Sequence, residues 1–255
     1  MKAVILCGGK GTRLSEETNL RPKPMVEIGG IPMLVHIMES YAKYGYKEFV
    51  LALGYKGDYI KNYFQGFFAR TNDFTLDLKS GSIEYLNQSR KDWKISFIDT
   101  GEESMTGGRL LRLKDHLKNE KTFMLTYGDG VSNINIEELV KFHKSHGKYA
   151  TVSAVRPVAR FGEMSMSQNL VTAFAEKPQT EAGWINGGFF VFNSEVFKFL
   201  DQGDETILER SPLENLTKEK QLMAYQHDGH WQCMDTLRDK EYLENLWQNK
   251  KAFWI

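Results

Sequence analysis

The strongest constraint on the fold is a regular alternation of short apolar runs with longer amphipathic segments. Strands are expected at residues 2–7, 47–53, 94–99, 122–127 and 150–156, and helices at 32–44, 57–68, 107–118 and 134–145. Strands that alternate with helices build a parallel sheet with helices on its faces. The order therefore predicts an α/β fold, with a Rossmann-like, mixed and mostly parallel sheet flanked by helices.

Two regions depart from this alternation. Residues 71–93 combine short β-like pieces with polar turns, which predicts a small antiparallel excursion near the mouth of a site. Beyond residue 156 the pattern is antiparallel, with strands expected at 163–166, 170–176 and 184–193. A last helix is expected at 236–250, where Thr236 and Asp239 have the spacing of a capping box. No linker-like segment appears, so we expect one domain over 1–255.

Composition excludes several classes of partner. The chain has 33 basic and 33 acidic residues, which cancel. There is no overall field to attract nucleic acid or an anionic membrane, and any anion site must be local. Cys7 and Cys233 are the two cysteines, too few for a disulfide framework or a paired-cysteine zinc site. No apolar run suits a signal peptide or a membrane span, so a cytoplasmic protein is expected.

The first predicted strand ends in a glycine-rich turn suited to phosphate. The glycines of residues 8–11 leave backbone N–H groups accessible, and Arg13 and Lys23 add two cations. Lys23 lies between two prolines, which fix the backbone around it. The Walker motif, which is Gly, four residues and then Gly-Lys-Ser/Thr, does not match this spacing. The dinucleotide-binding motif would need glycine where Leu14 stands. The segment therefore predicts a polyphosphate site of another kind.

A carboxylate at a strand end is a candidate magnesium ligand. Asp129 follows an apolar strand between two glycines, a position that also suits a simple turn. Asp235 precedes the last helix and could be its N-cap. Because Thr236 can cap that helix, Asp235 is free to point elsewhere.

Three other features favour structural interpretations. His143 and His146 share a predicted helix without a third ligand nearby, so a solvated helix end is favoured over zinc. Trp231 could lie against a sugar, but the core is the expected place. The aromatic residues of 247–254 could pack on the chain itself or on another subunit.

Together these motifs resemble the sugar-phosphate nucleotidyltransferases over essentially the whole chain. The signature of that family is a strand, then Gly-Gly-x-Gly-Thr-Arg-Leu, then Pro-Lys-Pro, present here at residues 8–14 and 22–24. A closer similarity to the branch that uses CTP and glucose 1-phosphate rests on residues 14–18, 54–57, 104–109, 127–130, 185–190 and 234–239. One departure is Cys7, where the family usually has alanine.

The resemblance implies a reaction. A cytidylyl group would pass from CTP to α-D-glucose 1-phosphate, giving CDP-glucose and pyrophosphate, with Mg²⁺ as cofactor. The nucleotide would bind to about residues 1–130 and the sugar to about 131–255. The family also implies a homo-oligomer, a hexamer, and a pathway toward CDP-dideoxysugars of O-antigen lipopolysaccharide.

The resemblance also implies roles for particular residues. Arg13 and Lys23 would be the catalytic cations, and Asp129 and Asp235 would hold Mg²⁺. The implied nucleotide-binding residues are Leu6, Cys7, Gly8, Gly9, Lys10, Gly11, Thr12, Arg13, Lys23, Ser104, Arg109 and Gly128. The implied sugar-phosphate-binding residues are Gly162, Glu176, Lys177, Asn186 and Gly187. Arg109 is expected to donate to the cytosine ring.

Other functions stay open at the level of sequence. The same chemistry could use UTP or dTTP, because only resemblance favours CTP. A non-catalytic, nucleotide-sugar-binding regulatory subunit would also share the fold, although the retained Arg13, Lys23, Asp129 and Asp235 argue for catalysis. A glycosyltransferase would more often carry Asp-x-Asp, which is absent.

Overall fold

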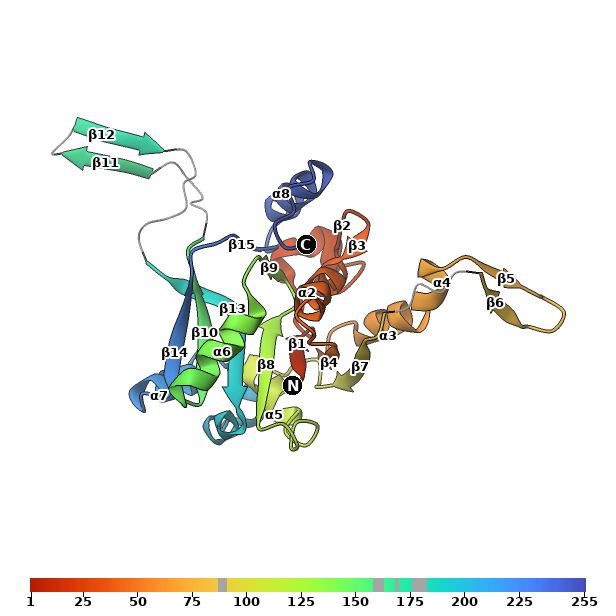
Figure 1. Cartoon of the computed structure of the whole chain (residues 1–255), viewed down its shortest axis with the longest axis horizontal. Helices are drawn as coiled ribbons and strands as arrows, with labels where there is room; N and C mark the ends of the chain where they lie inside the picture. The colour runs from red at the N-terminus through yellow and green to blue at the C-terminus, as the bar shows by residue number, and fades with distance from the viewer. Residues whose placement is uncertain (87–90, 158–162, 168–169, 176–182) are drawn as a thin grey trace.

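The computed structural model describes residues 1–86, 91–157, 163–167, 170–175 and 183–255. A seven-stranded sheet with the order β14-β10-β13-β8-β1-β4-β7 forms its centre (Figure 1). In chain order its strands are β1 (Ala3–Leu6), β4 (Glu48–Leu53), β7 (Lys94–Asp99), β8 (Thr122–Tyr127), β10 (Ala150–Val155), β13 (Ile185–Asn193) and β14 (Leu222–His227).

The sheet is mixed and mostly parallel. β1 pairs in parallel with β4 and β8, β4 with β7, and β10 with β14. β13 runs antiparallel to both of its neighbours, β8 and β10. Parallel neighbours need a crossover connection, which the helices supply. The predicted α/β fold is confirmed.

Helices cover both faces of this sheet. In chain order the helices of the described residues are α1 (Ser15–Thr18), α2 (Met33–Ala42), α3 (Gly57–Gln65), α4 (Phe67–Thr71), α5 (Thr106–Arg112), α6 (Ile136–His146), α7 (Ser211–Lys218) and α8 (Leu237–Gln248), with 3₁₀ turns η1 (Thr12–Leu14), η2 (Lys23–Met25), η3 (Ser194–Phe199) and η4 (Gly203–Glu205). Buried side chains of α2, α3, α6 and α8 join one core cluster, and those of α5 and α7 join another. The predicted helix at 107–118 ends at Arg112 and continues as hydrogen-bonded turns.

The first strand shows why the sheet has two cores. Ala3 and Ile5 lie in one cluster, and Val4 and Leu6 lie in the other. Successive side chains of a strand point to opposite faces, so a strand covered on both faces is apolar throughout. All four of these residues are buried, as expected for a central strand.

Two antiparallel hairpins stand apart from the sheet. They are β5 (Phe74–Leu76) with β6 (Ile83–Tyr85), and β11 (Glu163–Ser167) with β12 (Leu170–Ala175). Figure 1 shows them projecting from opposite ends of the molecule. The antiparallel excursion within 71–93 is confirmed, but its expected place near the mouth of the site is wrong. The hairpin follows α3 and α4, which carry it away from the sheet.

Two further short pairs brace the loops above the sheet. β2 (Glu27–Ile28) pairs with β3 (Ile31–Pro32), and β9 (Gly130–Ser132) pairs with β15 (Trp231–Cys233). The capping box of α8 is confirmed, since Thr236 and Asp239 bond each other's backbone N–H. Within the described part of the chain, no helix combines the length and apolarity that crossing a bilayer requires.

Candidate active site

A pocket of about 580 Å³ opens beyond the carboxyl ends of the central strands. This edge is where open α/β sheets bind ligands. It is lined by most of the predicted nucleotide-binding residues, namely Leu6, Cys7, Gly8, Gly9, Gly11, Thr12, Arg13, Lys23, Ser104, Arg109 and Gly128. Asp129, Asp235, Asn186 and Gly187 line it too. No lining residue belongs to the β5–β6 hairpin.

Four predicted residues are not placed in this pocket. Lys10 turns to Glu103, with which it forms an exposed ion pair of 2.7 Å. Its contact with the nucleotide stays a prediction. Gly162, Glu176 and Lys177 lie outside the described residues.

The glycine loop is fixed by backbone contacts to the neighbouring strand. The Cys7 amide donates to the Ala52 carbonyl at 2.9 Å, and the Tyr55 amide donates to Gly8 at 3.1 Å. Gly11 has a φ of 61°, a left-handed conformation that glycine adopts without strain. Burial raises the pKa of the Cys7 thiol, so it is uncharged beside the expected phosphates.

Arg109 holds the loops that line the pocket through hydrogen bonds to their backbone. The residue is only 4% exposed. The guanidinium donates to the carbonyls of Gly8 at 2.9 Å, Gly101 at 2.6 Å and Glu102 at 2.9 Å, and to the Thr100 hydroxyl at 3.0 Å. These contacts engage both terminal nitrogens of Arg109, which also lines the pocket, and its donation to the cytosine ring stays a prediction.

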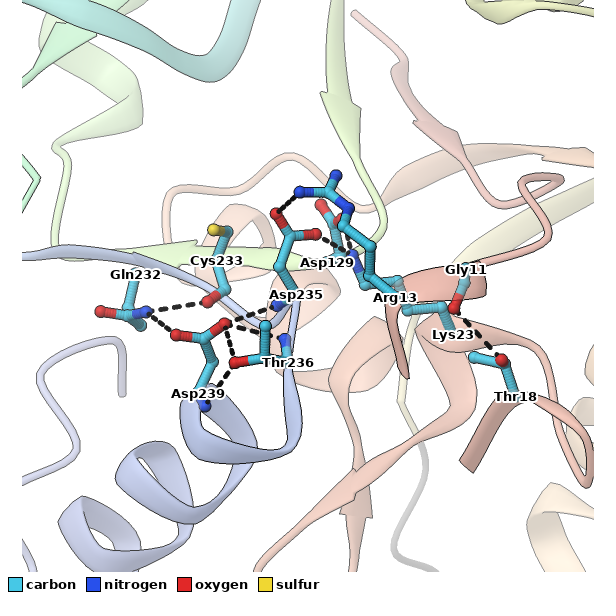
Figure 2. A network of polar contacts seen from close by, with 10 residues as sticks. All are labelled: Gly11, Arg13, Thr18, Lys23, Asp129, Gln232, Cys233, Asp235, Thr236 and Asp239. Atoms are coloured by element: carbon cyan, nitrogen blue, oxygen red, sulfur yellow. Dashed lines mark hydrogen bonds and ion pairs between the residues drawn. The ribbon is translucent and has the colours of Figure 1, made fainter. Parts of the chain in front are cut away.

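The four charged residues singled out in the sequence meet at one point. Lys23 Nζ lies 2.5 Å from Asp129 Oδ2 and 2.6 Å from Asp235 Oδ1. Arg13 Nη1 lies 2.8 Å from Asp235 Oδ2. Figure 2 shows the cations and the carboxylates directed toward one another.

Burial and pairing oppose each other in this cluster. Burial disfavours the charged form of Lys23, but the contacts with Asp129 and Asp235 outweigh it and raise the pKa of the lysine. Burial likewise opposes ionisation of Asp235, but the hydrogen bond and charge of Lys23 lower its pKa overall. Lys23 and Asp235 are therefore both ionised near neutral pH.

Segments distant in sequence bring the carboxylates together. Asp129 precedes β9 and Asp235 follows β15, and these strands pair with Cys233 opposite Gly130. The Met234 amide donates to the Asp129 carbonyl at 2.8 Å, which closes the pair. Since Thr236 caps α8, the Asp235 side chain is free for the cluster, as predicted.

A second polar network lines the pocket and was not anticipated. Tyr127 Oη donates to Glu209 Oε1, and Thr106 Oγ1 donates to Glu209 Oε2 at 2.7 Å. Asn186 Nδ2 approaches Tyr127 Oη at 3.4 Å. No motif surrounds Glu209 in the sequence, and only the fold brings it to Tyr127.

Trp231 and the helical histidines differ from the sequence expectations. Trp231 is half-buried, lines the pocket and donates through Nε1 to the Gly187 carbonyl at 2.7 Å, so it is not simply a core residue. His143 is 2% exposed and lies between Thr151 and Asn193, so the solvated helix end is wrong. Across the described ranges, no group of three or more His, Cys, Asp or Glu residues could hold a metal ion.

Known proteins are similar to this chain over its full length. A glucose-1-phosphate cytidylyltransferase of Salmonella typhi is 48% identical over 254 residues, which span 100% of this chain and 98% of the relative. A probable glucose-1-phosphate cytidylyltransferase of Bacillus subtilis is 44% identical over 254 residues, 100% of this chain and 99% of the relative.

Solved structures share the fold at low sequence identity. A UDP-glucose pyrophosphorylase complexed with UDP-glucose superposes with a TM-score of 0.69 at 17% identity, over 98% of each chain. The family model described as nucleotidyl transferase matches residues 2–244. This match spans nearly the whole chain, and this chain belongs to the nucleotidyl transferases.

Proposed function

We propose that this protein transfers a cytidylyl group from CTP to α-D-glucose 1-phosphate, giving CDP-glucose and pyrophosphate. The observation that carries the proposal is the meeting of Arg13, Lys23, Asp129 and Asp235 beside the glycine loop. The choice of CTP and glucose 1-phosphate is supported by the full-length similarity to the cytidylyltransferases of Salmonella typhi and Bacillus subtilis.

The proposed reaction is a displacement at the α-phosphorus of CTP. An oxygen of the sugar phosphate attacks, a new phosphorus–oxygen bond forms, and the bond to the β-phosphate breaks as pyrophosphate leaves. A phosphate monoester is largely dianionic at neutral pH, since its second pKa is about 6, so no general base is needed. The barrier is the approach of two anions. Arg13 and Lys23 offset their repulsion and align them.

We further propose Mg²⁺ as the cofactor, held by Asp129 and Asp235. The residues fit this ion, because one oxygen of each carboxylate already converges on a single cation, the Lys23 ammonium. Mg²⁺ usually takes one or two carboxylates together with phosphate oxygens, so two protein ligands suffice. When bound, it would neutralise charge on the triphosphate.

The two halves of the chain would divide the substrates. We assign the nucleotide to about residues 1–130, which supply the glycine loop, and the sugar phosphate to about 131–255. Asn186 and Gly187 line the pocket and support this assignment. The roles of Gly162, Glu176 and Lys177 in binding the sugar phosphate stay predictions.

A homo-oligomer is also part of the proposal. The β5–β6 hairpin exposes Leu76, Leu78 and Ile83 by 45%, 88% and 50% of their surface, although these residues do not line the pocket. Apolar side chains gathered on a projecting hairpin favour a protein contact. The hexamer, the cytoplasmic location and the supply of CDP-glucose to O-antigen lipopolysaccharide stay predictions.

The test is a pyrophosphate-release assay with glucose 1-phosphate, Mg²⁺ and each of CTP, UTP, dTTP and GTP. We expect CTP to give the highest kcat/KM. A preference for UTP or dTTP would keep the chemistry and replace the nucleotide. Binding of CTP without any pyrophosphate release would contradict catalysis and favour a regulatory nucleotide-binding protein.

A further inference from the structure

One carboxylate that lines the pocket has no part in the chemistry above. Glu209 lies between η4 and α7 and is exposed to the pocket. Its two carboxylate oxygens accept from two different hydroxyl groups, those of Tyr127 and Thr106. Among the residues that the structure describes, no lysine, arginine or histidine forms an ion pair with it.

The donors to Glu209 are themselves held in place. The Leu208 amide donates to Thr106 Oγ1 at 2.9 Å, so the proton of that hydroxyl is directed to Glu209. Asn186 Nδ2 donates to Tyr127 Oη at 3.4 Å, so the proton of the phenol is likewise directed to Glu209. The carboxylate is therefore fixed in orientation. An ionised carboxylate offers about four acceptor positions, and these two bonds use two of them.

A fixed negative charge is unexpected in a pocket for two anionic substrates. It would repel the triphosphate and the sugar phosphate. A carboxylate can only accept hydrogen bonds, so the part of a ligand beside it must carry donors. Sugar hydroxyls are such donors, and bonds from them to an ionised acceptor are stronger than neutral ones.

The position of Glu209 fits a sugar ring. Thr106 begins α5 in the half assigned to the nucleotide, whereas Asn186 belongs to β13 in the half assigned to the sugar phosphate. The hydrogen bonds of Glu209 connect Thr106 to Asn186 through Tyr127, which lies at the end of β8. We propose that Glu209 is a specificity-determining residue whose carboxylate accepts hydrogen bonds from sugar hydroxyls. The inference rests on the proposed function, because the ribose of CTP and the glucose of glucose 1-phosphate are the two sources of such hydroxyls.

The test compares ligands that lack single hydroxyls. Binding of CTP, 2′-deoxy-CTP and 3′-deoxy-CTP, and of glucose 1-phosphate and its 2-, 3-, 4- and 6-deoxy analogues, is measured by calorimetry with wild type and Glu209→Gln. In wild type, at least one deoxy ligand should bind about 10-fold or more weakly than its parent. In Glu209→Gln the same deoxy ligand should bind within about 2-fold of its parent, because the charged acceptor is gone. The quantity compared is the deoxy ratio, which is the Kd of the deoxy ligand divided by that of its parent.

Two further variants separate binding from structure. Glu205→Gln removes a nearby carboxylate that does not line the pocket, and it should keep the wild-type ratios. Tyr127→Phe removes one fixed donor to Glu209 but keeps the carboxylate. The deoxy ratio should therefore fall by a smaller factor than in Glu209→Gln. Glutamine matches glutamate in size and can still accept from Tyr127, so thermal unfolding of Glu209→Gln should match wild type.

The outcomes distinguish this inference from the proposed function. Unchanged deoxy ratios in a folded Glu209→Gln protein would overturn the inference. A changed preference between CTP and UTP, with unchanged deoxy ratios, would overturn it as well and assign Glu209 to the base. Failure of the proposed function is seen separately, as the absence of turnover of CTP and glucose 1-phosphate by wild type.

Discussion

Two neighbouring glycines of the phosphate loop, Gly8 and Gly9, differ in the space around them. A Cβ on Gly8 would lie 2.2 Å from Arg109 Nη1, whereas a Cβ on Gly9 would meet nothing within 4 Å. Arg109 cannot move away freely, because its guanidinium is bonded to several backbone carbonyls. The sequence motif shows both glycines alike, and only the buried arginine beneath separates them.

This difference gives a matched pair of variants. Gly8→Ala should lower the free energy of unfolding by about 1–3 kcal/mol, as overpacking of a filled site does. Gly9→Ala should stay within about 0.5 kcal/mol of wild type. Chemical denaturation of both proteins measures the two values. Equal stability of the two variants would contradict the position of the Arg109 guanidinium against Gly8.

Arg13 and Lys23 are the residues on which the proposed chemistry depends most. Either Arg13→Ala or Lys23→Ala should lower kcat by about 100-fold or more, because a preorganised positive charge is lost where negative charge builds up. Steady-state kinetics measure the effect, and circular dichroism checks the fold. Arg112→Ala is the control, because Arg112 pairs with Asp204 outside the pocket. Normal turnover in both site variants would refute the role of these cations.

The mutual pairing of these charges also predicts coupled binding. Without metal, CTP must draw Lys23 and Arg13 away from Asp129 and Asp235, which leaves two carboxylates unpaired. CTP should therefore bind about 10-fold or more tightly with Mg²⁺ than with EDTA, within the usual range of coupling between sites. Asp235→Asn should bind metal-free CTP more tightly than wild type does. Calorimetry measures these affinities, and weaker metal-free binding by Asp235→Asn would contradict the coupling.

At the scale of elements, α6 is tied to the sheet by two histidines. The Lys148 amide donates to His146 Nδ1, which leaves His146 Nε2 to donate to Thr151 Oγ1 at 2.8 Å. The Thr151 hydroxyl then donates to His143 Nδ1 at 2.9 Å, and His143 Nε2 donates to Asn193 Oδ1 at 3.1 Å. This assignment satisfies every group with both rings neutral.

The network predicts a loss of stability in acid. Burial lowers the pKa of His143 and of His146 below the ordinary 6.5. The unfolded chain therefore binds protons that the folded protein excludes, and stability is lost as the pH falls below about 6.5. His143→Leu should lower the free energy of unfolding by about 1–3 kcal/mol at pH 7.5, because Thr151 and Asn193 lose a hydrogen-bond partner. The difference in this free energy between the variant and wild type should shrink toward pH 5.5, as measured by chemical denaturation. A difference that is the same at both pH values would contradict this.

At the scale of the whole molecule, α3, α4 and the β5–β6 hairpin form an arm that projects from one end of the central sheet (Figure 1). The apolar side chains exposed on the hairpin, Leu76, Leu78 and Ile83, do not line the pocket, so catalysis does not explain them. A contact with another copy of the chain would cover them, which is the reason to expect an oligomer.

This expectation can be tested on the hairpin itself. Wild type should be an oligomer by light scattering, and the double variant Leu76→Asp, Ile83→Asp should shift to a smaller species, because two charges would be buried in the contact. Lys79→Ser, at the exposed turn of the same hairpin, is the control and should keep the wild-type mass. An unchanged mass in the double variant would exclude the hairpin from the interface.

Much of this protein was determined by local sequence. Apolar runs and helical periodicity depend on neighbouring residues, so the parallel sheet, the glycine loop after β1 and the capping box of α8 could be predicted. Arg13, Lys23, Asp129 and Asp235 were singled out because each lies in a motif with its own chemistry.

Tertiary structure alone decided which side chains meet. Lys23 bonds to Asp235 across 212 residues, and Tyr127 reaches Glu209 across 82, contacts that no local pattern encodes. The backbone carbonyls that surround the Arg109 guanidinium come from three loops, which only the fold brings together. His143 looked solvated until β10 and β13 supplied its partners. The physical reason is that periodicity records whether a residue is buried, whereas its hydrogen-bond partners depend on which distant strands pair beside it.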